Sequence, residues 1–71
     1  MQQFRVEATH PLGNSLALRD RAGQRHLARA LVEAPAVGAE LVGIAPQLGF
    51  GLMLGASNGR VFRLVFEQLD I

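Results

Sequence analysis

The feature of this sequence that most restricts its fold is the regular interruption of short apolar runs by glycine, proline and asparagine. The interruptions recur at intervals of roughly ten residues, so each run is long enough for a strand but shorter than most helices. The clearest of them is Asn58-Gly59, a pair that between two apolar runs is the strongest local signal of a β-hairpin. The spacing therefore predicts several short strands joined by tight turns.

Six segments have the side-chain pattern of strands. Residues 4–9 and 15–19 alternate apolar and polar side chains with a period of two, which is typical of a strand with one buried face. Residues 24–34 and 61–69 also place apolar side chains at helical spacing, so a helix is an alternative for each of them. A turn signal stands directly before both, and we therefore interpret them as strands, together with residues 40–44 and 50–54.

These strands predict an all-β, mainly antiparallel fold in which residues 1–71 form a single small barrel of five to six short strands. Closing the sheet into a barrel removes the exposed edges that a flat sheet in so short a chain would leave uncovered. In outline this arrangement resembles the SH3-like and OB-like small barrels. The resemblance covers the pattern of strands and turns only, since the sequence carries no family motif.

One turn predicts the pairing of two of the strands. Asp20-Arg21-Ala22-Gly23 has the residues of a type I turn closed by a left-handed glycine. This closure pairs Asp20 with Gln24, and the pairs that follow are Arg19 with Arg25, Leu18 with His26, Ala17 with Leu27, Leu16 with Ala28 and Ser15 with Arg29. Leucine and alanine side chains then share the inner face with His26. A register shifted by one residue would bury Arg25 and Arg29 among them, at a prohibitive cost.

The same register gathers Arg19, Arg25 and Arg29 on the outer face of the hairpin, with Arg21 close by in the turn. We call these four residues the arginine face. Such a face is either solvated and neutralised by carboxylates of the chain, for which Glu7 and Glu33 are candidates, or it binds nucleic-acid phosphate or another polyanion. Small barrels that bind single strands usually add aromatic stacking, but the chain has neither Tyr nor Trp. Phe62 and Phe66 are expected in the core. Phe4 and Phe50 could be exposed, but both lie in alternating runs for which burial is the simpler interpretation.

Apolar side chains also fall on strand faces that point away from the expected interior. Leu27 and Leu31 lie on the face of the arginines, and Val61, Val65 and Leu69 lie opposite the phenylalanines of the last strand. Apolar surface that a small core cannot hold often marks a protein contact, although loops or the C-terminal residues could also cover it. The leading interpretation is a non-enzymatic binding or assembly module that contacts a protein partner or a second copy of itself. Polyanion binding by the arginine face is the alternative.

The side chains that catalysis or metal binding requires are sparse. The sequence has no cysteine, which excludes disulfides and thiolate metal sites. Ser15 and Ser57 stand where turns favour small polar residues, His10 precedes a proline, and His26 is expected in the core. No metal-ligand spacing or glycine-rich phosphate loop is present. We therefore expect no enzymatic activity, cofactor or metal.

One uncharged stretch, residues 41–59, could be mistaken for a membrane segment. Pro46 and several glycines would break such a helix, so buried strands and turns are the better interpretation. The N-terminal residues lack the basic start and continuous apolar stretch of a secretory signal. We therefore expect a cytoplasmic protein without a membrane segment. The formal net charge of +1 gives no long-range electrostatic attraction to any partner.

Overall fold

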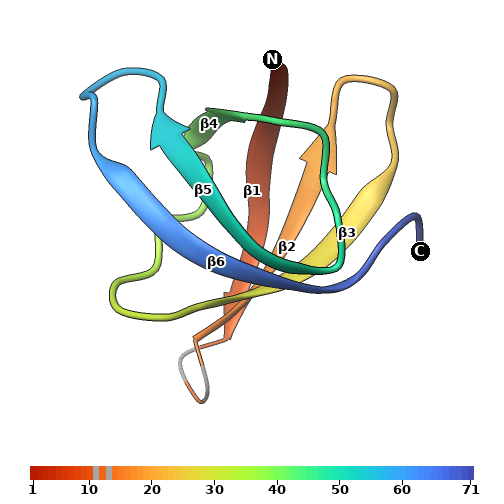
Figure 1. Cartoon of the computed structure of the whole chain (residues 1–71). Helices are drawn as coiled ribbons and strands as arrows, with labels where there is room; N and C mark the ends of the chain where they lie inside the picture. Colours follow the sequence, from red (N-terminus) through yellow and green to blue (C-terminus); the bar gives the residue numbers. More distant parts are fainter. Residues whose placement is uncertain (11, 13) are drawn as a thin grey trace.

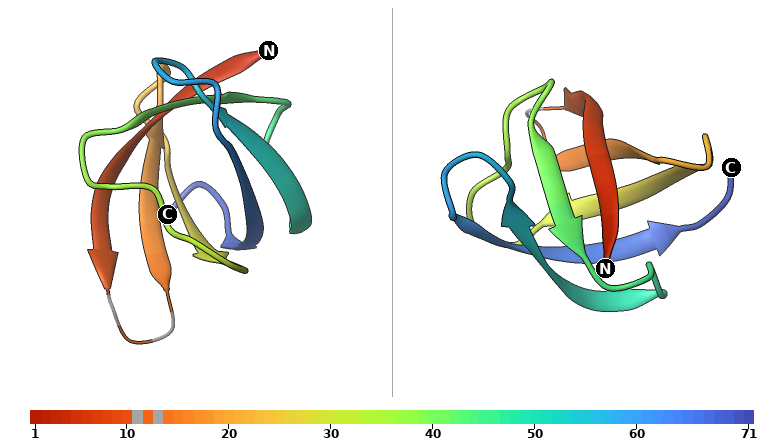
Figure 2. Two further views of the ribbon diagram at one scale, coloured as in Figure 1. Left: turned by 90° about the vertical axis from the view of Figure 1, so that its left-hand side faces the viewer. Right: turned by 90° about the horizontal axis from the view of Figure 1, so that it is seen from above.

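A computed structural model of the chain describes residues 1–10, 12 and 14–71, with the backbone alone at Leu54. Its strands form a closed antiparallel barrel in the order β1-β2-β3-β6-β5-β4 (Figure 1). Seen from above, they surround a common interior (Figure 2). The strands are β1 (Gln2–His10), β2 (Ser15–Asp20), β3 (Arg25–Ala30), β4 (Glu40–Gly43), β5 (Gly49–Gly55) and β6 (Val61–Gln68). The prediction of a small antiparallel β-barrel is therefore confirmed.

Both segments for which a helix was the alternative are strands. Residues 61–69 form β6 almost completely, whereas residues 24–34 contribute only β3. The expected strand is too long at its C-terminal end because β3 loses its neighbours there: Arg29 pairs with the first residue of β2, and Ala30 is the last to pair with β6. The part of the chain that the structure describes contains no helix long and apolar enough to cross a membrane.

The turn between β2 and β3 has the predicted geometry. Gly23 has a φ of 88°, and its N–H donates to the carbonyl of Asp20 at 3.1 Å. The Asp20 N–H donates to the Gln24 carbonyl at 2.9 Å, and the Gln24 N–H donates to Asp20 Oδ1 at 2.9 Å. The register that follows pairs Arg19 with Arg25 and continues as predicted from the sequence.

The interior is filled by alternate side chains from all six strands. His26 is the one polar side chain among the buried described residues, and it is 1% exposed. The apolar members of the core are Phe4, Val6, Leu16, Leu18, Ala28, Ala30, Leu41, Met53, Phe62, Leu64 and Phe66. Because the barrel is closed, these side chains exclude water with no helix to cover a sheet face.

In the first half of β5 the glycine faces the interior of the barrel and the large apolar side chains face outward. A Cβ atom on Gly51 would lie 3.4 Å from Cε2 of Phe66, so the ring of Phe66 fills the space inside β5. The large side chains of β5 on either side of Gly51 therefore point outward: Phe50 is 62% exposed and Leu52 is 50% exposed. The expectation that Phe50 is buried is wrong, because Phe66 already occupies the interior there.

β5 is also longer than the strand beside it. β4 pairs with β5 only as far as Met53, which lies opposite Gly43. The preceding residues, 49–52, pair with β6 but extend past the end of β4. Among the described residues, the segment 49–52 therefore has a partner strand on its β6 side only.

Candidate functional site

The arginine face is larger than the sequence indicated. Arg5 of β1 pairs with Arg19, which pairs with Arg25, and Glu40 of β4 lies opposite Arg5 at the end of this row. Arg5 could not be placed from the sequence because its position depends on a β-bulge. The register of β1 shifts between Val6 and Ala8, and without the extra residue Arg19 would face an inward-pointing position of β1.

The extra residue of that bulge, Glu7, neutralises two of the arginines. Nε of Arg19 donates to Glu7 Oε2 at 2.6 Å, and Nε of Arg25 donates to Glu7 Oε1 at 3.2 Å. The hydrogen bond from Arg19 lowers the pKa of Glu7, and the same bond raises the pKa of Arg19. Arg19 also donates from Nη1 to the carbonyl of Gly23 at 2.7 Å. The two guanidinium groups therefore have anionic or carbonyl partners within the chain.

The other arginines on this side of the barrel also have partners. Nε and Nη2 of Arg5 donate to Oε1 of Glu40 at 3.0 and 2.8 Å. Nε of Arg29 lies 3.9 Å from Oε2 of Glu67. Among the described residues Arg21 has no carboxylate within ion-pair distance, and its Nη1 donates to the side chain of Gln3 at 3.4 Å. The other expected partner, Glu33, is not on this face and pairs with Arg60 instead.

A hollow of about 390 Å³ lies beside this row of charges. Its walls carry guanidinium groups and carboxylates together, from Arg5, Arg19, Arg21, Glu7, Asp20 and Glu40. A site that selects phosphate instead concentrates positive charge and N–H donors. The hollow therefore has mixed charge that favours neither an anion nor a cation.

His26 is held by partners on both ring nitrogens. Nε2 lies 2.9 Å from Oδ2 of Asp20, and the N–H of Asp70 donates to Nδ1 at 3.3 Å. These contacts fit a neutral ring with its proton on Nε2, and the hydrogen bond to His26 lowers the pKa of Asp20. The rings of Phe4 and Phe66 lie edge-on to it at 6.1 and 6.4 Å. His26 thus joins the core to the β2–β3 turn and to the C-terminal residues, with no ring nitrogen left for a ligand.

Groups suited to a metal ion are also absent from the described part of the chain, where no three side chains of His, Asp or Glu gather in a suitable cluster. The surface of the barrel is what remains as the place where this chain could act.

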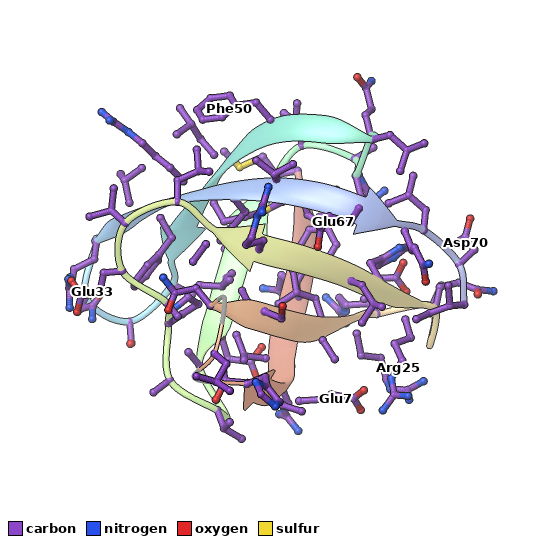
Figure 3. All side chains as sticks on the ribbon, turned by 90° about the horizontal axis from the view of Figure 1, so that it is seen from below. Glu7, Arg25, Glu33, Phe50, Glu67 and Asp70 are labelled. Carbon is purple, nitrogen blue, oxygen red and sulfur yellow. The ribbon has the colours of Figure 1, made fainter. Side chains whose placement is uncertain are left out.

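An apolar surface that contains one charged residue, Arg63, covers the outer side of β5 and β6. Phe50 lies opposite Val65, and Leu52 lies opposite Arg63. Leu48 and Val61, which are 69% and 59% exposed, extend it at either end. Figure 3 shows Phe50 projecting from the side of the barrel opposite to Glu7 and Arg25. We call this region the β5–β6 apolar surface and define it by Leu48, Phe50, Leu52, Val61 and Val65.

The structure places the five predicted interface residues differently. Val61 and Val65 belong to the β5–β6 apolar surface, and Val65 is half-buried there. Leu31 is 48% exposed just after β3, and Leu27 is half-buried on β3. Leu69 is half-buried and packs against the core, so it is not part of the exposed surface.

Sequence reasoning missed Leu48, Phe50 and Leu52, which are three of the five residues of this surface. The signal was present in β5, where glycines at positions 49, 51 and 55 share one parity and Phe50 and Leu52 share the other. The pattern alone does not show whether the glycine face or the Phe50 and Leu52 face of β5 points into the barrel. The position of Phe66 decides this, because its ring lies inside β5 at Gly51.

Comparison of the chain with protein-family models, with curated proteins and with solved structures finds no match in any of the three.

Proposed function

We propose that this chain is a non-enzymatic assembly module that contacts another protein surface through the β5–β6 apolar surface. The observation that carries the proposal is the exposure of Phe50 and Leu52 at successive outward positions of one strand. Leaving a large apolar side chain in water instead of burying it forgoes about 1.5–3 kcal/mol. Adjacent side chains of this kind gain that free energy together when a partner covers them.

The arginine face gives less support to the alternative of polyanion binding. Phosphate would have to compete with Glu7 for Arg19 and Arg25, and with Glu67 for Arg29. Counterion release drives phosphate binding, and a guanidinium group already paired with a carboxylate contributes less to it. Outward placement of these arginines is compatible with polyanion binding but does not favour it over a solvated face.

Two broader features belong to the same proposal. The six short antiparallel strands support a relationship to the SH3-like or OB-like small barrels, many of which present a surface instead of a catalytic cleft. The lack of cysteine supports a cytoplasmic location, because a small barrel there must be stable without disulfides.

An experiment with two matched variants tests the proposal. We would measure binding of an apolar fluorescent dye to the unmodified chain, to a Phe50→Ser, Leu52→Ser variant and to an Arg19→Gln, Arg25→Gln, Arg29→Gln variant. The proposal expects the unmodified chain and the arginine variant to bind the dye equally, and the serine variant to bind at least about threefold less. Equal dye binding by all three proteins would overturn it, because the accessible apolar surface would then lie elsewhere. Retention on heparin, lost only in the arginine variant, would support the alternative instead.

A further inference from the structure

We infer that the partner of the β5–β6 apolar surface is a second copy of this chain, packed face to face about a two-fold axis at Val65. Arg63 of each copy then pairs with Glu67 of the other. This inference rests on the proposed function and names its partner.

The first observation is that Arg63 is the one arginine without a partner among the described residues. The other six of the seven arginines each have a side-chain hydrogen bond or an ion pair within the chain. Arg63 is exposed on the outer face of β6, opposite Leu52 and two residues from both Val61 and Val65. A purely apolar partner would take this guanidinium group out of water without giving it a counter-charge, which is unfavourable. A partner that covers this surface must therefore bring a carboxylate to Arg63.

The second observation is that the chain carries such a carboxylate at the matching position. Arg63 and Glu67 stand two residues before and two residues after Val65 on the outer face of β6. Oε2 of Glu67 lies 3.9 Å from Nε of Arg29, so its side chain is on the outer face but makes no hydrogen bond there. Glu67 can therefore accept hydrogen bonds from a second guanidinium group.

These positions make the surface complementary to itself. A two-fold contact requires that if residue i touches residue j of the second copy, residue j touches residue i of that copy. An axis that crosses β6 at Val65 in the plane of the contact runs the two β6 strands antiparallel, so Val65 meets Val65 and Arg63 meets Glu67. Phe50 lies opposite Val65 on β5, so the two Phe50 rings also meet near the axis.

The geometry of packed sheets allows these contacts. Strands of two sheets that pack face to face lie within about 30° of each other, and side chains within two residues of the axis stay within reach at that angle. The contact uses outward side chains and no strand edge, so the pairing of β5 with β4 and β6 is unchanged.

Arg29 does not oppose this arrangement. It lies one strand beyond Val65, on β3, where the wall of the closed barrel curves away from the second copy. Each Glu67 then lies between Arg29 of its own copy and Arg63 of the other, just as Glu7 serves two arginines within one chain. The contact therefore has an apolar centre with a charge-paired rim, which is the usual composition of a specific interface.

The size of the contact indicates a reversible dimer. A standard interface removes about 800 Å² from each partner, which is roughly one fifth of the 4425 Å² surface of this chain. Two convex walls that touch along two strands bury less than that, so we expect a dissociation constant on the order of micromolar or weaker. The ion pairs set the orientation more than the affinity, because an exposed pair contributes little, whereas like charges brought together in an interface cost much more.

Charge reversal tests the contact directly, because the two charges of each pair come from different copies. Arg63→Glu brings carboxylates together at both pairs, and Glu67→Arg brings guanidinium groups together. In an equimolar mixture of the two variants, the mixed dimer has opposite charges at both pairs again. Arg60→Glu and Glu33→Arg make the same changes in net charge at an ion pair within one chain, and they are the controls.

Sedimentation equilibrium should show each variant alone associating at least about tenfold more weakly than the unmodified chain, and the mixture recovering to within about threefold of it. The controls, alone or mixed, should stay within about threefold of the unmodified chain. A mixture that associates no better than either variant alone would overturn the inference, as would variants no weaker than the controls.

Two further measurements do not depend on the folding of either single variant. The double variant Arg63→Glu, Glu67→Arg keeps the formal net charge of +1 and should associate like the unmodified chain. Isotope-filtered NOEs between the Phe50 ring of one copy and the Val65 methyls of another are expected in the unmodified chain at high concentration. A double variant that fails to associate, or a dimer without these NOEs, would contradict the arrangement.

The outcomes separate this inference from the proposed function. If self-association depends on Phe50 and Leu52 but the charge variants behave like their controls, the two-fold arrangement is wrong and the apolar assembly surface stands. If the chain stays monomeric at every concentration but its dye binding depends on Phe50 and Leu52, the inference fails and the surface has another protein as its partner. If dye binding does not depend on these residues, both proposals fail.

Discussion

The two sides of this barrel differ in whether their exposed side chains have partners within the chain. On β1, β2 and β3, Arg19 and Arg25 share the carboxylate of Glu7, while Arg5 pairs with Glu40. On β5, Phe50 and Leu52 are exposed beside an edge that has no strand partner among the described residues. The charged side is therefore complete within one chain, whereas the apolar side is not. A conspicuous cluster of charge is therefore not, by itself, evidence of a binding surface in a small protein.

The two sides also differ in how well water solvates their exposed side chains. Water solvates exposed guanidinium groups and carboxylates well, so a partner that covers them gains little. Water offers no comparable compensation to Phe50 and Leu52, so covering them is favourable. This contrast predicts which substitutions change association and which change only the stability or charge of the monomer.

The largest effect is expected from placing charge on the apolar side. A Phe50→Lys, Leu52→Lys variant should weaken self-association by about 100-fold, since losing two interface anchors costs on the order of 1–2 kcal/mol each. Both side chains are exposed in the monomer, so its circular dichroism should not change. Sedimentation equilibrium measures the association, with a Val32→Lys, Val37→Lys variant at two other exposed positions as the control of equal charge. An undiminished association constant would remove β5 from the contact.

The next effect concerns the stability of the charged side. Asp20→Ala removes the acceptor for the buried His26 and for the N–H of Gln24, which should lower the free energy of unfolding by about 2 kcal/mol. Asp70→Ala is the control, because the Asp70 carboxylate is exposed and 4.0 Å from His26. Urea unfolding compares the two. An equal loss in both variants would contradict the structural role of Asp20.

A smaller effect should appear as a dependence of stability on pH. The pKa values of Glu7 and Asp20 are lowered in the folded chain, by the hydrogen bonds from Arg19 and His26 respectively. Each carboxylate therefore stabilises the fold above its unfolded pKa of about 4, and this stability is lost as the pH falls through the lower folded value. Urea midpoints measured below about pH 5 should decrease with falling pH. An Asp20→Asn variant should show a shallower decrease, and an identical slope would contradict the assignment.

The smallest effect on stability, but an informative one, is expected from Glu7→Gln. It takes the formal net charge from +1 to +2 by removing one negative charge, and it leaves Arg19 and Arg25 without their shared carboxylate. We expect little change in unfolding and a later elution from heparin. Glu33→Gln has the same net charge but leaves the arginine face intact, so it should elute earlier than Glu7→Gln. Identical elution would show that net charge alone sets retention.

The sequence specified the charged side better than the apolar side, for a local reason. Gly23 sets the β2–β3 turn, and the turn determines which side chains of that hairpin share a face. Glu7 was a foreseeable partner, but the bulge that aligns Arg5 with Arg19 has no signal of its own in the sequence. The orientation of Phe50 depends on Phe66, which lies on another strand and packs against the inner side of Gly51. Packing between strands decides which face of β5 is buried. The alternation of side chains within one strand identifies its two faces but does not show which of them points inward.

Sedimentation equilibrium of the unmodified chain at two ionic strengths tests most directly which side makes the contact. Charged contacts weaken as salt shortens the Debye length from about 14 Å at about 0.05 M to about 4 Å at about 0.5 M, whereas apolar contacts do not. We predict self-association whose constant changes by less than about twofold between these conditions. A loss of about tenfold or more at the higher salt would mean that charge holds the copies together, and would contradict the assignment of the contact to β5 and β6.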